Sequence, residues 1–191
     1  MPTIEISNPI AGGGYVVASQ TIGLPAAASN TAVHAAVTDT GVDQNVTTGL
    51  TNPDVPRNVT ATAGGTAGDI KAIQVVVHGT DINDQVISET LPAFTVNSTG
   101  TVVGSKAFKT VTSVDIPAHD GTGATTAIGT GTKLGLNTRL SRNSTVAAFL
   151  GRVRETTAPT VVFDATNVSG NTVTLAGTLN GSAVIVDFYD S

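Results

Sequence analysis

The sequence predicts an all-β protein, an antiparallel β-sandwich or barrel-like domain. Threonine is the most abundant residue, and glycine occurs 21 times. Threonine and valine are restricted at χ1 and fit a pleated surface, while glycine and asparagine supply tight turns. The chain has no tryptophan and only 4% aromatic residues, so its core must consist of Val, Ile, Leu and Ala. With 40% hydrophobic residues over 191 positions, there is enough apolar material for one.

Residues 1–56 differ from the rest and are expected to form an extended N-terminal arm. The segment contains Gly12-Gly13-Gly14 and ends in Asn52-Pro53-Asp54-Val55-Pro56. Short β-like pieces at 15–17 and 33–37 lie between these breakers. Because the arm has little apolar material of its own, we expect it to lie on this domain or on a neighbouring subunit. A loose tail is the alternative.

Residues 57–191 are expected to form the β-domain, which opens with a strand and a hairpin. The strand covers 58–63 and ends at Gly64-Gly65. The runs 70–79 and 85–91 carry alternating side chains on either side of Asp81-Ile82-Asn83-Asp84. Two such runs around a short Asp/Asn turn predict a β-hairpin.

Further short strands follow at the spacing typical of a sandwich or barrel. We predict them at 101–108, 110–116, 125–128, 133–136, 160–165, 172–175 and 183–189. The last run is dense in apolar residues and needs burial on both faces. The final strands, 160–189, are therefore expected to complete a sheet in this chain or in a neighbour.

The stretch 143–155 breaks the strand pattern and predicts one short helix. Asn143 or Ser144 supplies an N-cap. Apolar side chains then follow at the helical spacing i, i+3, i+4 and i+7, namely Val146, Phe149, Leu150 and Val153. Gly151 opposes the helix.

Charged residues make up only 12% of the chain, about half of the roughly 25% usual in globular proteins. Two interpretations are open. The surface is either covered by hydroxyl and amide groups, or it is covered by other subunits, where charge would be costly to desolvate. The net charge of −5 argues against nucleic acid as a partner. The nearest approach to a basic cluster comprises Arg139, Arg142, Arg152 and Arg154.

The chain has no cysteine, and no run approaches the roughly 20 apolar residues of a membrane-spanning helix. The N-terminus lacks the basic and apolar segments of a signal peptide. We therefore expect synthesis in the cytoplasm of the producing cell and no membrane association.

The sequence offers no constellation for catalysis, for a cofactor or for a metal ion. Three histidines lie in separate segments without metal-ligand spacing, and each is expected to be a surface or hydrogen-bonded residue: His34, His78 and His119. The stretch Asp81-Ile82-Asn83-Asp84 fails as an EF-hand loop because Val86 occupies the sixth position, where Gly is needed. We interpret it as a hairpin turn. The chain contains no G-x-S-x-G elbow, and its glycine-rich pieces precede no convincing helix.

Four stretches of strand and turn residues carry the last signal of the sequence. They are Pro56–Thr60, Val77–Asp81, Ile87–Leu91 and Ser105–Val114. Over about residues 56–137, the chain resembles virion proteins of tailed bacteriophages, namely small β-sandwich proteins among the head decoration (cement) and tail components. No catalytic motif accompanies the resemblance.

The resemblance implies a capsid decoration protein as the leading function, located in the virion and made in the host cytoplasm. Such a protein would form a small homo-oligomer, with a trimer favoured, on the shell of the major capsid protein. Its arm would staple neighbouring subunits, and many weak contacts would add up by symmetry. The alternatives are a tail, neck or fibre-type component, a receptor- or glycan-binding module, and an enzyme. The shortage of aromatic residues disfavours a glycan site, and no constellation supports an enzyme.

Overall fold

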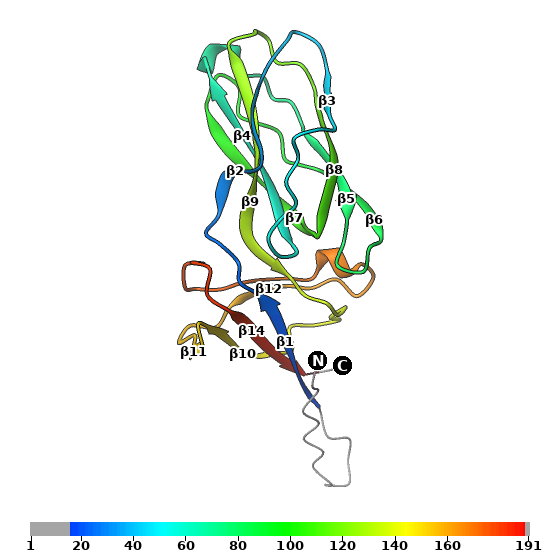
Figure 1. Cartoon of the computed structure of the whole chain (residues 1–191), viewed down its shortest axis with the longest axis vertical. Coiled ribbons are helices and arrows are strands. Elements are labelled where there is room, and N and C mark those ends of the chain that lie inside the picture. The colour runs from blue at the N-terminus through cyan, green and yellow to red at the C-terminus, as the bar shows by residue number, and fades with distance from the viewer. Residues whose placement is uncertain (1–15, 190–191) are drawn as a thin grey trace.

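The computed structural model describes residues 16–189, which form an elongated molecule of two lobes stacked along its long axis (Figure 1). We call residues 27–133 the sandwich lobe, and residues 16–26 together with 134–189 the terminal lobe. Residues 1–15 and 190–191 lie outside the described part of the chain. Every regular element apart from two short 3-10 turns in the described part is a strand, so the predicted all-β class is confirmed.

The sandwich lobe consists of two antiparallel sheets that enclose an apolar core. In the first sheet, β4 (Arg57–Gly65) lies between β7 (Gly100–Phe108) and the long β9 (Ala124–Gly135), and β2 (Ser29–Thr38) pairs with the first half of β9. The second sheet runs in the order β3 (Gln44–Val46), β8 (Thr110–Ile116), β5 (Val76–Thr80) and β6 (Val86–Thr90).

The terminal lobe carries a third sheet, which we call the terminal sheet. Its order is β1 (Val17–Gly23), β14 (Val184–Tyr189), β10 (Thr145–Leu150) and β11 (Val153–Arg154). The strands β12 (Thr160–Val162) and β13 (Thr172–Thr174) extend the first sheet into this lobe, since β13 pairs with the end of β9. The 3-10 turns are η1 (Ala67–Asp69) and η2 (Val168–Gly170).

Each lobe has its own hydrophobic core. The larger cluster fills the sandwich lobe and includes Val59, Val77 and Val114, none of which is exposed. The smaller cluster lies between the terminal sheet and the lower end of the first sheet, around Leu134 and Val186. As expected from composition, both are built mainly from aliphatic side chains, each of which contributes about 1.5–3 kcal/mol when fully buried.

In the part that the structure describes, the expected N-terminal arm contributes three strands to the sheets of this chain. β1 pairs with β14, β2 with β9, and β3 with β8. The strand expected at 33–37 lies within β2, and its Val33 is 1% exposed in the larger core. The strand expected at 15–17 falls mostly outside β1, and Tyr15 lies outside the described residues.

The hairpin predicted around residues 81–84 is confirmed, but its first strand is shorter than predicted, since β5 begins at Val76 and residues 70–75 belong to no strand. β5 and β6 pair antiparallel from Val76 opposite Thr90 to Thr80 opposite Val86. The remaining predicted strands, except those at 125–128 and 133–136, correspond to β4, β7, β8, β13 and β14 with small shifts at their ends, and to β12, which ends at Val162 and covers half of the predicted 160–165.

The helix predicted at 143–155 is wrong, because this stretch forms the hairpin of β10 and β11. Leu150 pairs with Val153, and the two-residue turn between them has φ of +59° at Gly151 and +71° at Arg152. Two consecutive left-handed residues are typical of a tight hairpin turn. Phe149 and Leu150 then lie on opposite faces of the sheet, and pairing of β10 with β14 outweighs the helical spacing.

The two strands predicted at 125–128 and 133–136 are one strand, β9, which runs through Gly129 and Gly131. These glycines do not break the strand because other groups approach them closely. A Cβ at Gly129 would lie 2.0 Å from the carbonyl oxygen of Ser29, and one at Gly131 would lie 2.5 Å from the amide of Asn58. Glycine within a strand often marks such an approach.

Arg57 ties the two lobes together at a register shift between β4 and β9. Its side chain is 1% exposed. Nε donates to the carbonyl of Gly131 at 2.8 Å, and Nη1 donates to the carbonyl of Ala26 at 3.0 Å and to Asp54 at 3.1 Å. A buried guanidinium is tolerated only with such partners.

Candidate docking surface

His119 is the most buried histidine, at 6% exposed, and its contacts are structural. Its Nδ1 accepts a hydrogen bond from the backbone N–H of Lys71 at 3.2 Å, so Nε2 carries the proton and faces the Thr126 hydroxyl at 3.1 Å. The ring stacks on Phe94 with centroids 5.9 Å apart. Burial lowers the pKa of His119, against the opposing charges of Asp39 and Asp120. The neutral ring therefore anchors the loop after β8.

The structure brings His78 to a carboxylate that the sequence analysis did not pair with it. Its Nε2 lies 2.9 Å from Asp115 Oδ2, and the other carboxylate oxygen accepts from the Asn45 side-chain amide. Hydrogen bonds from Asn45 and then from His78 lower the pKa of Asp115. The three residues stand side by side on β5, β8 and β3, on the surface of the second sheet. They are 37 and 70 residues from Asp115 along the chain, so only sheet pairing could reveal the cluster.

The third histidine, His34, lies on β2 and places Nδ1 2.7 Å from the carbonyl oxygen of Ala35. Asp81 is buried, and its carboxylate accepts from the backbone N–H groups of Asn83 at 2.8 Å and Gln85 at 3.0 Å. These contacts are those of a hairpin turn closed by an Asp side chain. Among residues 16–189, no group of three or more His, Asp or Glu side chains is arranged to hold a metal ion.

Glu89 is a buried carboxylate that accepts hydrogen bonds from groups at a bulge in β7. It accepts from the backbone N–H of Ser105 at 2.6 Å, from the Ser105 hydroxyl at 2.7 Å and from the backbone N–H of Lys106 at 3.2 Å. The register of β7 against β4 shifts at this point. Glu89 therefore stabilises the irregular strand.

The four arginines of the basic stretch all belong to the terminal lobe. Arg152 and Arg154 lie on the β10–β11 hairpin, and Arg139 donates to the carbonyl of Thr166 at 3.4 Å. They give this lobe a different charge balance from the sandwich lobe. The terminal lobe holds four basic and three acidic residues, and the sandwich lobe holds five basic and nine acidic residues.

A hollow of about 270 Å³ lies where the two lobes meet. We call it the shoulder. It lies between the β5–β6 turn and the loop that leads into η2, and Asn83, Val86, Asn167 and Val168 contribute to its lining. Val86 is 88% exposed. Polar amides and open apolar groups together make a surface suited to contact with another protein.

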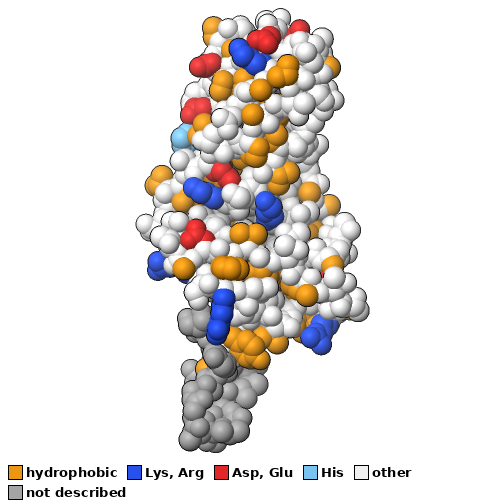
Figure 2. All heavy atoms as spheres, turned by 180° about the vertical axis from the view of Figure 1, so that it is seen from behind, with side chains coloured by type: hydrophobic (Ala, Val, Ile, Leu, Met, Phe, Trp, Pro, Cys, Tyr) orange, Lys and Arg blue, Asp and Glu red, His pale blue; other side chains and the backbone are white. Residues whose placement is uncertain are grey.

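The edge strand β12 carries further exposed apolar side chains. It is the last strand of its sheet, and Val162 and the following Phe163 are 48% and 49% exposed. Figure 2 shows hydrophobic side chains spread along the molecule, with charged groups few and scattered. An open edge with apolar side chains favours pairing with another chain.

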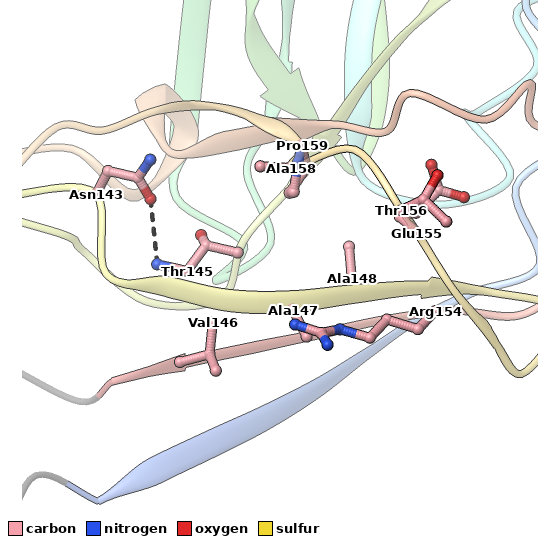
Figure 3. A pocket seen from close by; sticks show the side chains of 10 residues that line it. All are labelled: Asn143, Thr145, Val146, Ala147, Ala148, Arg154, Glu155, Thr156, Ala158 and Pro159. Carbon is pink, nitrogen blue, oxygen red and sulfur yellow. Dashed lines mark hydrogen bonds between the residues drawn. The ribbon is translucent and has the colours of Figure 1, made fainter.

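A second hollow, of about 470 Å³, lies in the terminal lobe (Figure 3). Thr145 and Ala148 of β10 point toward the loop with Ala158 and Pro159, whereas Arg154 lies on the opposite side of β10. The lining is mostly of small side chains, and the nearby Glu155 carboxylate accepts from the backbone N–H of Gly177 at 2.6 Å. Nothing in the lining is arranged for acid–base or nucleophilic chemistry among the residues described.

No helix in residues 16–189 has the length and apolar character needed to cross a membrane. No protein-family model, curated protein or solved structure matched the chain.

Proposed function

We propose that the protein is a structural component of a tailed-phage virion, a capsid decoration (cement) protein that stabilises the head shell. It docks on the major capsid protein and on copies of itself, in the virion, after synthesis in the host cytoplasm. The resemblance over residues 56–137 points to this class, in which a trimer is the favoured assembly. The observation that carries the proposal is a contrast. Apolar side chains are exposed at the shoulder and along β12, whereas buried polar groups bond within the fold.

The internal use of polar groups supports a docking role over a reactive one. Buried ionisable side chains, among them Arg57, Glu89 and His119, bond to other groups of their own fold. Such contacts rigidify a scaffold. A rigid scaffold loses little conformational freedom on docking, which favours repeated weak contacts on a shell.

The shoulder and the β12 edge form the proposed contact with the shell. Val86 is 88% exposed and Phe163 is 49% exposed, so covering them releases water from apolar surface. Each contact is modest, but many copies on one shell multiply it.

The test is binding of the purified chain to expanded heads that lack it. We expect saturable binding at a fixed number of copies per shell, and particles that remain viable without the protein. Val86→Lys and Phe163→Lys should each weaken binding by about tenfold, the equivalent of about 1.4 kcal/mol per side chain. Val42→Lys is the matched control, because Val42 is 64% exposed in a loop at the far end of the sandwich lobe.

The outcome of deleting the gene separates head from tail. Heads that fill and gain tails, but break more readily, support decoration. Tailless heads would instead assign the protein to the tail or neck, and absence from purified particles would contradict any virion role.

A further inference from the structure

The terminal sheet has two unlike faces. Its inner face holds Val184, Val186 and Phe188 of β14, all buried in the smaller core. Its outer face holds the alternate residues Ile185, Asp187 and Tyr189. Among residues 16–189, the main contacts of β1, β10 and β14 with other strands lie within this sheet, which forms the lower end of the body (Figure 1). The strand that sequence analysis expected to be buried on both faces is therefore buried on one.

The outer face has an apolar centre. Phe149 of β10 stands directly opposite Ile185 of β14, and Ala147 stands opposite Asp187. Phe149 and Ile185 are half-buried and do not belong to either core. Toward the start of β1, Val17 stands opposite Tyr189, which is 41% exposed. Figure 2 shows hydrophobic side chains together with basic groups at this end of the described part of the molecule.

One acidic and one basic side chain flank this centre. Arg154 of β11 pairs with Phe149, so it lies in the same row as Phe149 and Ile185, on the far side of β10 from β14. Asp187 lies on β14, one row along. Figure 3 shows Arg154 on the opposite side of β10 from the inward-facing Ala148. The face therefore presents a positive edge and a negative strand separated by one apolar strand.

We propose that a second copy of the chain covers this face, in a two-fold pair whose axis runs along β10. Such an axis brings Phe149 against Phe149 of the other copy. It also places each Arg154 over the β14 of the other copy, within one residue row of Asp187. Two-fold pairing requires a self-complementary patch of this kind, and face-to-face sheets pack about 10 Å apart. The pairing does not depend on the virion role.

The size of the face sets the expected strength. The terminal sheet is four strands wide, at about 4.8 Å per strand, and about six residues long, at about 3.4 Å per residue. These dimensions give a face of roughly 300–400 Å². This is small beside the interfaces of stable dimers, so we expect a dissociation constant of about 10–100 µM. A two-fold pair also differs from the trimer that the resemblance favours, and the mass of the complex distinguishes the two.

The test is sedimentation of the full chain from about 1 to about 300 µM, a range that brackets the expected constant. We expect a shift from the 19.1 kDa monomer to a species of twice that mass. Ile185→Lys should weaken pairing at least tenfold, whereas Val42→Lys, in the exposed loop between β2 and β3, should leave it unchanged. Circular dichroism and thermal melting establish that each variant is folded.

A charge exchange makes the test specific for the proposed geometry. Arg154→Asp and Asp187→Arg alone should each weaken pairing severalfold, and the double variant should recover most of the loss. A monomer at every concentration, a trimer, or a double variant weaker than both singles would overturn the inference. If the native chain pairs but does not bind expanded heads, the proposed function alone is contradicted. If it binds heads but does not pair, the pairing alone is contradicted.

Discussion

The sandwich lobe and the terminal lobe differ in how the apolar faces of their strands are covered. In the sandwich lobe, two sheets close on each other, and valines such as Val77 and Val114 are fully buried between them. In the terminal lobe, one sheet covers its inner face with the end of the first sheet and leaves Phe149 and Ile185 on the other side. A closed sandwich is complete by itself, whereas a sheet with one apolar face open is suited to a partner.

The largest effect is expected at the junction of the lobes. Arg57→Ala should lower the free energy of unfolding by about 3–5 kcal/mol, because it removes the positive partner of Asp54 and the side-chain donor to the carbonyls of Ala26 and Gly131. Urea denaturation measures it. Arg139→Ala is the control and should cost less than about 0.5 kcal/mol, since its long contact to Thr166 lies at the surface. Equal costs would show that Arg57 does not join the lobes.

The two faces of the terminal sheet differ most clearly at a pair of phenylalanines. Phe188 is 4% exposed in the smaller core, and Phe149 lies on the outer face. Phe188→Ala should cost about 3–5 kcal/mol, whereas Phe149→Ala should cost about 1 kcal/mol in the dilute monomer. Thermal and urea denaturation at low protein concentration compare them. A loss of stability at Phe149 as large as at Phe188 would mean that the outer face is already covered.

Glu89→Gln tests the closure of the sandwich lobe at the β7 bulge. The variant keeps the shape but loses a charge-assisted acceptor for Ser105 and Lys106, so we expect a loss of about 1–2 kcal/mol. Lys106 and Ser105 amides should also exchange with deuterium faster. Unchanged exchange at these two amides would contradict the assigned role.

The stability of the sandwich lobe should depend on pH through His119. Burial lowers its pKa from the ordinary 6.5, so the unfolded chain binds the proton more tightly than the folded one. Stability from this group is complete above about pH 6.5 and declines as pH falls toward the lowered folded value. Urea denaturation at several pH values should show this slope in the native protein and a shallower one in His119→Gln. A slope of opposite sign would indicate a charged ring in the fold.

The smallest effect is expected at the exposed pair of Lys109 and Asp84, 2.8 Å apart in the sandwich lobe. Lys109→Ala should change stability by less than about 1 kcal/mol, because water and salt screen such a pair. A larger loss, measured by urea denaturation, would mean that the sandwich surface depends on its few charges.

Alternation of Val, Ile and Thr was enough to predict the class and most strands, because neighbouring residues carry that signal. The hairpin around Asp81 follows from local turn chemistry in the same way. Residues 143–155 mislead because Phe149 and Leu150 satisfy helical spacing as well as opposite faces of a strand, and β14 decides between them. Gly129 and Gly131 look like breakers until Ser29 and Asn58 are seen to approach them.

The candidate sites depend on contacts between distant segments, and for this reason the sequence did not reveal them. His78 and Asp115 are joined only by the pairing of β5 with β8. The outer face of the terminal sheet joins Arg154 and Phe149 to residues near the C-terminus. Only the density of apolar residues in 183–189 hinted at a second covered face.

Hydroxyl-radical footprinting at low and high protein concentration tests most directly whether the terminal lobe is the one with an open face. Between about 2 and about 200 µM, a range set by the expected dissociation constant, oxidation of Phe149 and Ile185 should fall at least twofold. Oxidation of Val86 and Phe163 at the shoulder and β12 should stay constant. Constant oxidation of Phe149, or a decrease confined to the sandwich lobe, would contradict the account.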